Sequence, residues 1–315
     1  MRQRGPDECG ASRRPDPRHG GCGASREVPC AQEGDRRQGR GGECPHPRGL
    51  IGREGLVLRL RVLGSGSGGN SIAVRSGDTL LLVDLGFSFK EEKNRLADCG
   101  VDIGEVSAVL FTHDHSDHCK GIATFHKRLP DVPLVANGDT ADAIARQTGV
   151  NDGWTLFENG EPFELGDITV TAFSISHDAA DPVGYLFEVD GSSLFVGTDM
   201  GVVTSNVRMA FSRATCAVLE ANHDPVLLEQ SDRPISLKQR IRGRTGHLSN
   251  EDAAMLVRET NPLCLKTLLL GHISSECNSP SLARRAFADV FEELGRTDVH
   301  LSVLEQDSPG DLFEF

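Results

Sequence analysis

The run Thr112-His113-Asp114-His115-Ser116-Asp117-His118 places three imidazoles and two carboxylates within seven residues, directly after the apolar stretch 106–111. Side chains alternate along an extended chain, so His113 and His115 should point the same way and share one metal ion. Asp117 and His118 are adjacent, and we expect them to diverge and to serve two metals from opposite sides. A helix is expected to follow over 119–129. The alternative is a polar loop that contains these histidines by chance and binds no metal.

The types of ligand in this run limit which metals it could bind. Neutral imidazole and carboxylate oxygen suit Zn, Mn, Fe or Ni, whereas a closed structural zinc cage usually contains paired thiolates, which this run lacks. The run therefore predicts a divalent metal site that keeps positions open for chemistry.

Four more polar residues each stand just past an apolar run. They are Asp84 after 79–83, His177 after 168–176, Asp199 after 193–197 and His272 after 265–270. An α/β scaffold keeps its catalytic groups on loops at the ends of buried strands. We expect these four side chains to join the histidine run in one site.

In these motifs and their order the sequence resembles the metallo-β-lactamase-fold hydrolases. The resemblance implies an α/β fold, an αββα sandwich, with two divalent metal ions, zinc or manganese, at one edge. It further implies that one metal is held by His113, His115 and His177, the other by Asp117, His118 and His272, and that Asp199 bridges them. Asp84 resembles the family's residue that orients the ligand loop without touching metal.

Four further segments narrow the resemblance to the bacterial YycJ/WalJ group, which is related to ribonucleases Z and J. These segments are 63–71 (LGSGSGGNS), 220–224 (EANHD), 246–252 (GHLSNED) and 270–274 (LGHIS). The group acts as 5′-to-3′ exonucleases on double-stranded DNA, so DNA is the implied substrate. Cys277 departs from the group, since a second Asn is expected there beside Asn278.

The same resemblance suggests a proton donor. His247 occupies the place of the ribonuclease Z histidine that protonates the leaving oxygen, and Glu220 matches its acidic partner. A histidine held by a carboxylate can act as a general acid near neutral pH. The alternative is that His247 only caps or packs beside the helix expected over 250–259, for which Ser249 is a plausible N-cap. Asp117 is expected to be both ligand and base.

Several residues are candidate phosphate contacts. The glycine-rich stretch before Asn70 and Ser71 predicts a tight turn, and these two side chains could also bond near the metals. The free amides behind Ser249 could receive a phosphate. The segment 233–244 is the main basic concentration of the domain, and a solvated helix face is its alternative. It contributes Arg233, Lys238, Arg240, Arg242 and Arg244.

Charge and composition divide the chain. Residues 1–55 carry eleven arginines and eight acidic residues, a net charge of +3. Because the whole chain has a net charge of −13, residues 56–315 have a net charge of −16. This segment is rich in Arg, Gly and Pro and cannot bury a core, so it is expected to be disordered. We interpret it as translated upstream sequence with the natural start near Leu56, against the alternative of an Arg/Gly nucleic-acid tail. Residues 56–315 are expected to form the catalytic domain.

The remaining expectations concern location and function. The sequence has no export signal and no apolar stretch long enough to span a membrane, which indicates a cytoplasmic protein without membrane partners. It contains no feature that fixes an oligomeric state. The favoured function is a metal-dependent exonuclease on DNA. The acidic charge favours the alternative, a hydrolase of a small ester or cyclic phosphodiester with the same metals. A third possibility is a non-enzymatic binding module, but such a protein would be expected to lack some of the metal ligands, and none is missing.

Overall fold

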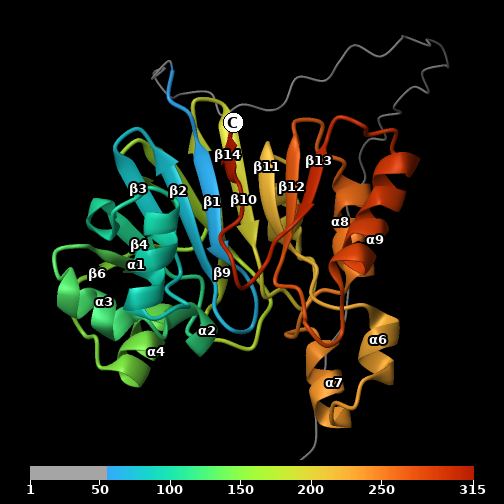
Figure 1. The fold of residues 1–315 in the computed structure, drawn as a ribbon, viewed down its shortest axis with the longest axis horizontal. Helices are drawn as coiled ribbons and strands as arrows, with labels where there is room; N and C mark the ends of the chain where they lie inside the picture. Colours follow the sequence, from blue (N-terminus) through green and yellow to red (C-terminus); the bar gives the residue numbers. More distant parts are fainter. Residues whose placement is uncertain (1–54) are drawn as a thin grey trace, which may run out of the picture. The chain divides into compact units, whose positions relative to one another are not determined.

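The computed structural model describes residues 55–315, so the interpretation of the N-terminal segment lies outside the described residues. Two seven-stranded sheets form the centre of the fold (Figure 1). The first sheet has the order β14 (Leu312–Glu314), β1 (Arg59–Gly64), β2 (Ser71–Ser76), β3 (Thr79–Val83), β4 (Ala108–Leu110), β5 (Leu134–Ala136) and β6 (Trp154–Leu156). The second has the order β13 (His300–Val303), β12 (Thr267–Gly271), β11 (Cys216–Glu220), β10 (Ser192–Gly197), β9 (Val183–Val189), β8 (Ile168–Ser174) and β7 (Pro162–Leu165).

Both sheets are mixed in the same way. Strands β14, β1, β2 and β3 pair antiparallel, and β4, β5 and β6 continue from β3 in parallel. In the second sheet β7 to β10 pair antiparallel, and β11, β12 and β13 continue from β10 in parallel. Loops that leave the carboxyl ends of the parallel strands therefore gather at one edge of each sheet, where such folds place their sites.

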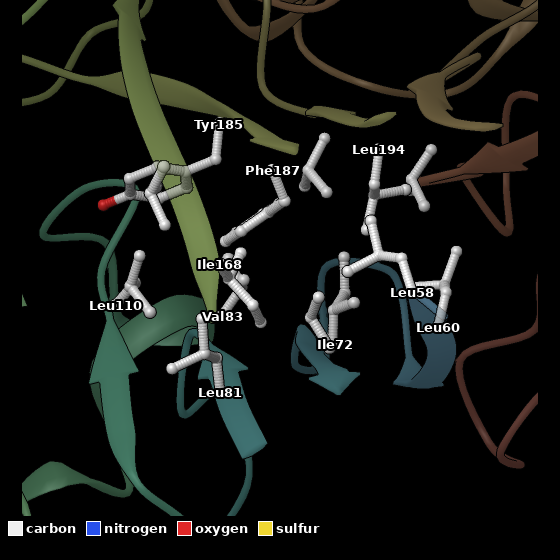
Figure 2. Close-up of a cluster of buried hydrophobic side chains, with 14 of the residues drawn as sticks. Leu58, Leu60, Ile72, Leu81, Val83, Leu110, Ile168, Tyr185, Phe187 and Leu194 are labelled. Atoms are coloured by element: carbon white, nitrogen blue, oxygen red, sulfur yellow. The ribbon is translucent and has the colours of Figure 1, made fainter. Parts of the chain in front are cut away.

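The main core lies between the two sheets. Leu60 and Val62 of β1 belong to one buried cluster with Ile168 and Phe187 of the second sheet. Figure 2 shows part of this cluster. Tyr185 is the largest wholly buried side chain of this layer, and its hydroxyl donates a 2.5 Å hydrogen bond to the carbonyl of Phe111. This bond ties the second sheet to the segment that leads into the histidine run.

Helices cover the outer face of each sheet. The first sheet is covered by α1 (Phe89–Asp98), α3 (Ile122–Arg128) and α4 (Gly138–Thr148), and the second by α5 (Ser205–Phe211), α8 (Asn250–Thr260) and α9 (Pro280–Glu293). The short helices α6 (Pro225–Gln230) and α7 (Ile235–Ile241) lie together at one end of the second sheet (Figure 1). The layers are thus helix, sheet, sheet, helix, which confirms the expected αββα sandwich.

The predicted elements are recovered with one clear difference. The strand expected over 79–83 is β3, and Ser249 accepts a hydrogen bond from the Asp252 amide as the N-cap of α8. The helix expected over 119–129 is instead two helices, because α2 (Ser116–Cys119) starts earlier and ends before Gly121. A Cβ on Gly121 would lie 2.2 Å from the Phe87 carbonyl oxygen, so only glycine fits where these two backbone segments meet.

None of the helices described between residues 55 and 315 is both long and apolar enough to cross a membrane.

Candidate metal centre

Three histidines from two loops form the first group of possible ligands. His113 and His115 follow β4, and His177 follows β8. The Nε2 atom of His177 lies 3.2 Å from Nδ1 of His115, and the rings of His113 and His177 are 5.1 Å apart. The two histidines of the run therefore turn to the same side, as expected from their spacing.

A second group joins Asp117, His118 and His272. Oδ2 of Asp117 lies 3.7 Å from Nε2 of His118 and 3.9 Å from Nε2 of His272. The expectation that Asp117 and His118 diverge is wrong. It assumed extended backbone, in which neighbouring side chains point about 180° apart. The helix α2 begins at Ser116 and separates neighbours by only about 100°, so both side chains reach the same site.

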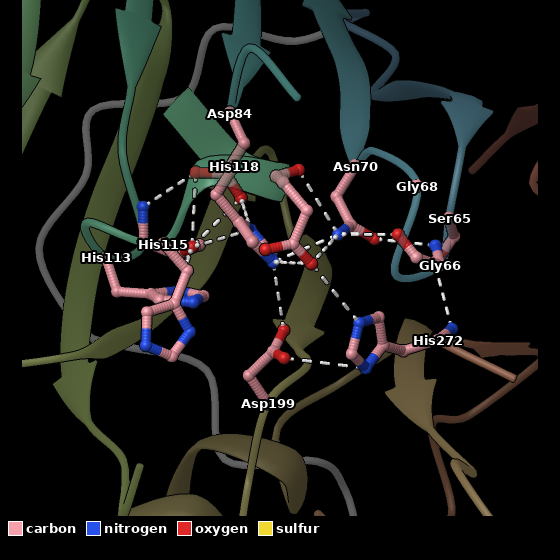
Figure 3. Close-up of polar contacts among 12 residues, drawn as sticks. Ser65, Gly66, Gly68, Asn70, Asp84, His113, His115, His118, Asp199 and His272 are labelled. Carbon is pink, nitrogen blue, oxygen red and sulfur yellow. Dashed lines mark hydrogen bonds and ion pairs between the residues drawn. The ribbon is translucent and has the colours of Figure 1, made fainter. Parts of the chain in front are cut away.

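Asp199 lies between the two groups. Its Oδ2 is 3.2 Å from Nε2 of His118 (Figure 3). Its Oδ1 is 3.8 Å from Nε2 of His177. Burial alone would raise the pKa of this carboxyl, but His272 and His118 hold it well below its usual range. A carboxylate that stays charged between two imidazole groups is suited to bridge two cations.

The loops that carry these ligands depend on unusual backbone. Asp84, Asp199 and His272 all have left-handed conformations, with φ of 66°, 59° and 55°. Residues other than glycine rarely adopt this conformation, and strain of this kind collects at functional sites. All three follow the strands β3, β10 and β12, so the strain turns each side chain into the edge where the ligands gather.

Asp84 holds the histidine run from behind. Its carboxylate accepts hydrogen bonds from the backbone amide of Thr112 (2.9 Å) and from Nδ1 of His118 (2.8 Å). The Thr112 hydroxyl in turn lies 2.9 Å from Nδ1 of His113. These contacts orient both rings with Nε2 toward the site. Metal-binding histidines are commonly held in this way by a partner on the other ring nitrogen.

The donor set fits divalent metal. The Nε2 atoms of His113 and His272 and the Oδ2 atom of Asp199 are buried and make no hydrogen bond of good geometry to the described residues, although this Oδ2 forms an ion pair with His118. Buried polar atoms rarely lack a partner, and these three all face the same site. The His/Asp clusters His113–His115–His177 and Asp117–His118–His272 are therefore suited to hold divalent cations.

Comparison with known proteins agrees with this geometry. Residues 79–273 match the model of the beta-lactamase superfamily domain. The chain is 36% identical to exodeoxyribonuclease YycJ of Bacillus anthracis over 242 residues, which cover 76% of this chain and 91% of the relative. It is 35% identical to exodeoxyribonuclease WalJ of Streptococcus pneumoniae serotype 2 over 252 residues, which cover 79% and 92%. The chain belongs to the metallo-β-lactamase superfamily and its YycJ/WalJ group.

Solved structures share the same fold. YhfI from Bacillus subtilis, a metallo-β-lactamase fold protein, covers 82% of this chain and 100% of its own, with a TM-score of 0.62 and 17% identity. Unliganded yeast PDE1 covers 81% and 99%, with a TM-score of 0.60 and 13% identity. At these identities the likeness concerns the fold. Together with the family match it makes this chain a metallo-β-lactamase-fold hydrolase.

The hydrolase brings Glu220 and His247 together beside the ligand groups. Oε1 of Glu220 lies 2.8 Å from Nδ1 of His247 and 3.1 Å from Nδ1 of His272, while Oε2 accepts a 2.7 Å bond from the Met200 amide. Burial alone would raise the pKa of Glu220, but the His247 ring lowers it to about 2. His247 is therefore held by a charged carboxylate and does not serve as the cap of α8, the role that Ser249 fills.

The two residues behind the glycine-rich turn differ in position. The Asn70 side chain lies 3.0 Å from Nε2 of His118 and 3.5 Å from Oδ2 of Asp117 through its Nδ2 atom, and its Oδ1 accepts a bond from Gly66 (Figure 3). Ser71 is wholly buried at the start of β2, beside the Glu92 carboxyl. Asn70 thus faces the ligands, and Ser71 faces the helix layer.

The five basic candidates are also separated by the fold. Arg240 alone among them has an ion pair with a residue of the site, Asp178, which follows His177. The others have different surroundings: Arg233 pairs with Glu276, Lys238 donates to the carbonyl of Glu229, Arg242 pairs with the Glu229 carboxylate, and Arg244 is exposed with its carbonyl bonded to Ser176.

Sequence reasoning missed two residues that support the site. Asp178 has an oxygen 3.5 Å from Nε2 of His177, and its position directly after a candidate ligand was the available signal. Asp114 accepts bonds from the Ala180 amide and from Gln147, which fixes the loop after His177 against the histidine run.

Cys277, which stands where the YycJ/WalJ group is expected to have a second Asn, is buried, and its carbonyl accepts a bond from the Asp224 amide. The departure at this position therefore leaves the ligand groups untouched.

Proposed function

We propose that this hydrolase cleaves phosphodiester bonds of DNA, as a 5′-to-3′ exonuclease on double-stranded substrate. The observation that carries the proposal is the Glu220–His247 pair beside two groups of ligand-type side chains. His247 Nδ1 lies 3.6 Å from Oδ1 of Asp199, so a potential proton donor adjoins the candidate metal centre. The names of the YycJ and WalJ relatives support nucleic acid as the substrate.

We further propose two metal ions, zinc or manganese, one held by His113, His115 and His177 and one by Asp117, His118 and His272, with Asp199 between them. Such a pair, when bound, supplies a nucleophile at neutral pH and neutralises charge that builds on a phosphate. The acidic and imidazole side chains at the site match the ligand preferences of both metals.

The chain's own residues then have distinct tasks. Asp117 is partly exposed and directs one carboxylate oxygen toward both His118 and His272, so it can orient a water molecule and accept its proton. Because Glu220 engages Nδ1 of His247, Nε2 is the ring atom left to face substrate and to protonate the leaving oxygen. Asn70 and Arg240 are the candidate phosphate contacts whose positions support that role.

A second candidate function is hydrolysis of a small ester or cyclic phosphodiester at the same centre. The observation in its favour is the net charge of −16 over residues 56–315, which gives no general attraction to a polyanion. A small substrate needs no such attraction.

One experiment separates the two functions. The purified full chain is loaded in turn with Mn²⁺ and Zn²⁺ and incubated with 5′-labelled duplex DNA and, separately, with bis(p-nitrophenyl) phosphate, with Asp117→Ala as control. The proposal expects metal-dependent release of labelled mononucleotide that is absent from the control. Intact DNA together with hydrolysis of the small diester would favour the second function.

A further inference from the structure

Asp178 and Arg240 form the contact that joins the basic helix α7 to the candidate metal centre. The Nε atom of Arg240 lies 2.6 Å from Oδ2 of Asp178, and Nη2 lies 3.1 Å from Oδ1. This is a two-point pair in which the planar guanidinium matches both oxygens of a planar anion. The side chain of Arg240 remains 53% exposed, so solvent and ligands reach it.

The same carboxylate touches the first ligand group. Oδ1 of Asp178 lies 3.5 Å from Nε2 of His177 and 3.9 Å from Nε2 of His115. The guanidinium of Arg240 therefore lies one carboxylate away from the candidate metal ligands. The hydrogen bond to Asp178 and, more weakly, the charge of Asp117 raise the pKa of Arg240, so its guanidinium stays charged beside the first ligand group.

The surrounding chain fixes this position. Ser176 donates a 2.7 Å bond to the carbonyl of Arg244, and Nδ1 of His177 lies 3.1 Å from the carbonyl of Gly246. A Cβ on Gly201 would lie 2.2 Å from the Arg244 carbonyl oxygen, so the backbones meet closely there. The loop between Arg240 and His247 is thus packed against the segment that carries His177 and Asp178.

We propose that Arg240 binds a substrate phosphate next to the one that is cleaved, and that the Asp178 carboxylate occupies this phosphate's place until substrate arrives. The inference rests on the proposed function and deepens it, because it makes Arg240 the residue that distinguishes a polynucleotide from a substrate with a single phosphodiester. Phosphate oxygens and a carboxylate compete for the same two guanidinium edges. The neighbouring phosphate of DNA would meet a cation at this mouth, whereas a lone diester would have no group to reach it.

The test compares Arg240→Gln with Arg258→Gln. Arg258 is a matched control because it is similarly exposed, pairs with a carboxylate (Glu293) and lies on α8 away from the ligands. In the metal-loaded enzyme, Arg240→Gln is expected to lower kcat/KM for duplex DNA by about 10- to 100-fold, as for loss of a charged hydrogen bond. Its kcat/KM for bis(p-nitrophenyl) phosphate is expected to fall far less than its kcat/KM for duplex DNA, and its metal content is expected to match that of Arg258→Gln.

A binding measurement gives a readout independent of cleavage. The dissociation constant of a phosphorothioate duplex is measured across salt concentrations, and the slope of log K against log salt is expected to fall by about one for Arg240→Gln only. Asp178→Asn is expected to tighten DNA binding, because it removes the competing charge. Equal effects of Arg240→Gln and Arg258→Gln, or weaker DNA binding by Asp178→Asn, would overturn the inference. DNA left intact by the wild type would instead overturn the proposed function.

Discussion

Asp84 and His118 meet 2.8 Å apart, through Oδ2 and Nδ1, in a contact that joins the end of β3 to α2. Both side chains are almost wholly buried, and Asp84 reaches this position only through a left-handed backbone conformation. The contact leaves Nε2 of His118 to face Asp199 and Asp117. One strained residue that is not itself a candidate ligand therefore orients the second ligand group.

Replacing Asp84 with asparagine should weaken metal binding without disturbing the fold. Asparagine tolerates left-handed backbone, so the change removes the charge behind His118 and keeps the geometry. We expect metal affinity to fall by about 10- to 100-fold, measured as metal retained in competition with a chelator. Asp190→Asn is the control, since Asp190 is also left-handed but lies in the exposed turn between β9 and β10. Equal retention by the two variants would refute the role of Asp84.

Asp117 and His247 should differ when each is replaced with alanine. Asp117→Ala removes a proposed ligand and the proposed base, so both metal content and activity should fall to background. His247→Ala removes only the proposed proton donor, so metal content should be kept while kcat falls by about 10²- to 10⁴-fold. Parallel metal analysis and pH–rate profiles of the two variants check this, and equal losses in both properties would contradict it.

Stability should depend on pH through Glu92, which is wholly buried in α1 and distant from the ligands in sequence. Burial raises its pKa from about 4.5 to about 8. The folded chain therefore keeps a proton that the unfolded chain releases, so the contribution to stability is complete below pH 4.5 and is lost as pH rises toward 8. Glu92→Gln should remove this loss.

The measurement for Glu92 is urea unfolding of wild type and Glu92→Gln between pH 4.5 and 8. The difference in free energy of unfolding should grow in favour of the variant, to roughly 1–4 kcal/mol at pH 8, since one pKa unit corresponds to about 1.4 kcal/mol. A difference that stays constant over this range would show that Glu92 does not titrate as proposed.

Two glycines of α4 should respond in opposite directions to alanine. Gly149 ends the helix with φ of 78°, whereas Gly138 begins it with ordinary backbone, and an added Cβ meets no atom within 4 Å at either position. Gly149→Ala should cost about 1–2 kcal/mol through left-handed strain alone. Gly138→Ala should be neutral or stabilise by up to about 0.5 kcal/mol, because alanine is the better helix former. Thermal unfolding of both variants measures the contrast, and similar shifts in Tm would contradict it.

The sequence predicted which strands and loops carry the site, but it did not predict the backbone conformation of the residues in those loops. Asp84, Asp199 and His272 could be placed after their strands because buried strands have a strong apolar signature that ends where a polar residue begins. Their left-handed conformations were not predictable, because they are imposed by tertiary contacts such as the bond from Thr112 to Asp84. The convergence of Asp117 and His118 was missed for a different reason. The helix α2 has four residues, which are too few to give a periodic pattern in the sequence.

Contacts between distant segments were the other gap. The five basic residues between 233 and 244 look alike in sequence, and only the packing of α7 beside the segment after β8 selects Arg240 for Asp178. The pairing of Glu220 with His247 was anticipated from family resemblance, and the structure adds the amides of Met200 and Leu248, which donate hydrogen bonds to Oε2 of Glu220. Such choices depend on which loops meet across the two sheets, which no local pattern encodes.

The glycine-rich turn before Asn70 is held by residues translated much later. Gln306 accepts a hydrogen bond from the amide of Gly68 across 238 residues, and β14 closes the first sheet beside β1. At about 5–20 residues per second, a ribosome needs about 10–50 s to make the chain between these partners. The turn therefore gains this support from Gln306 only near the end of synthesis, long after the ribosome has made the histidine run.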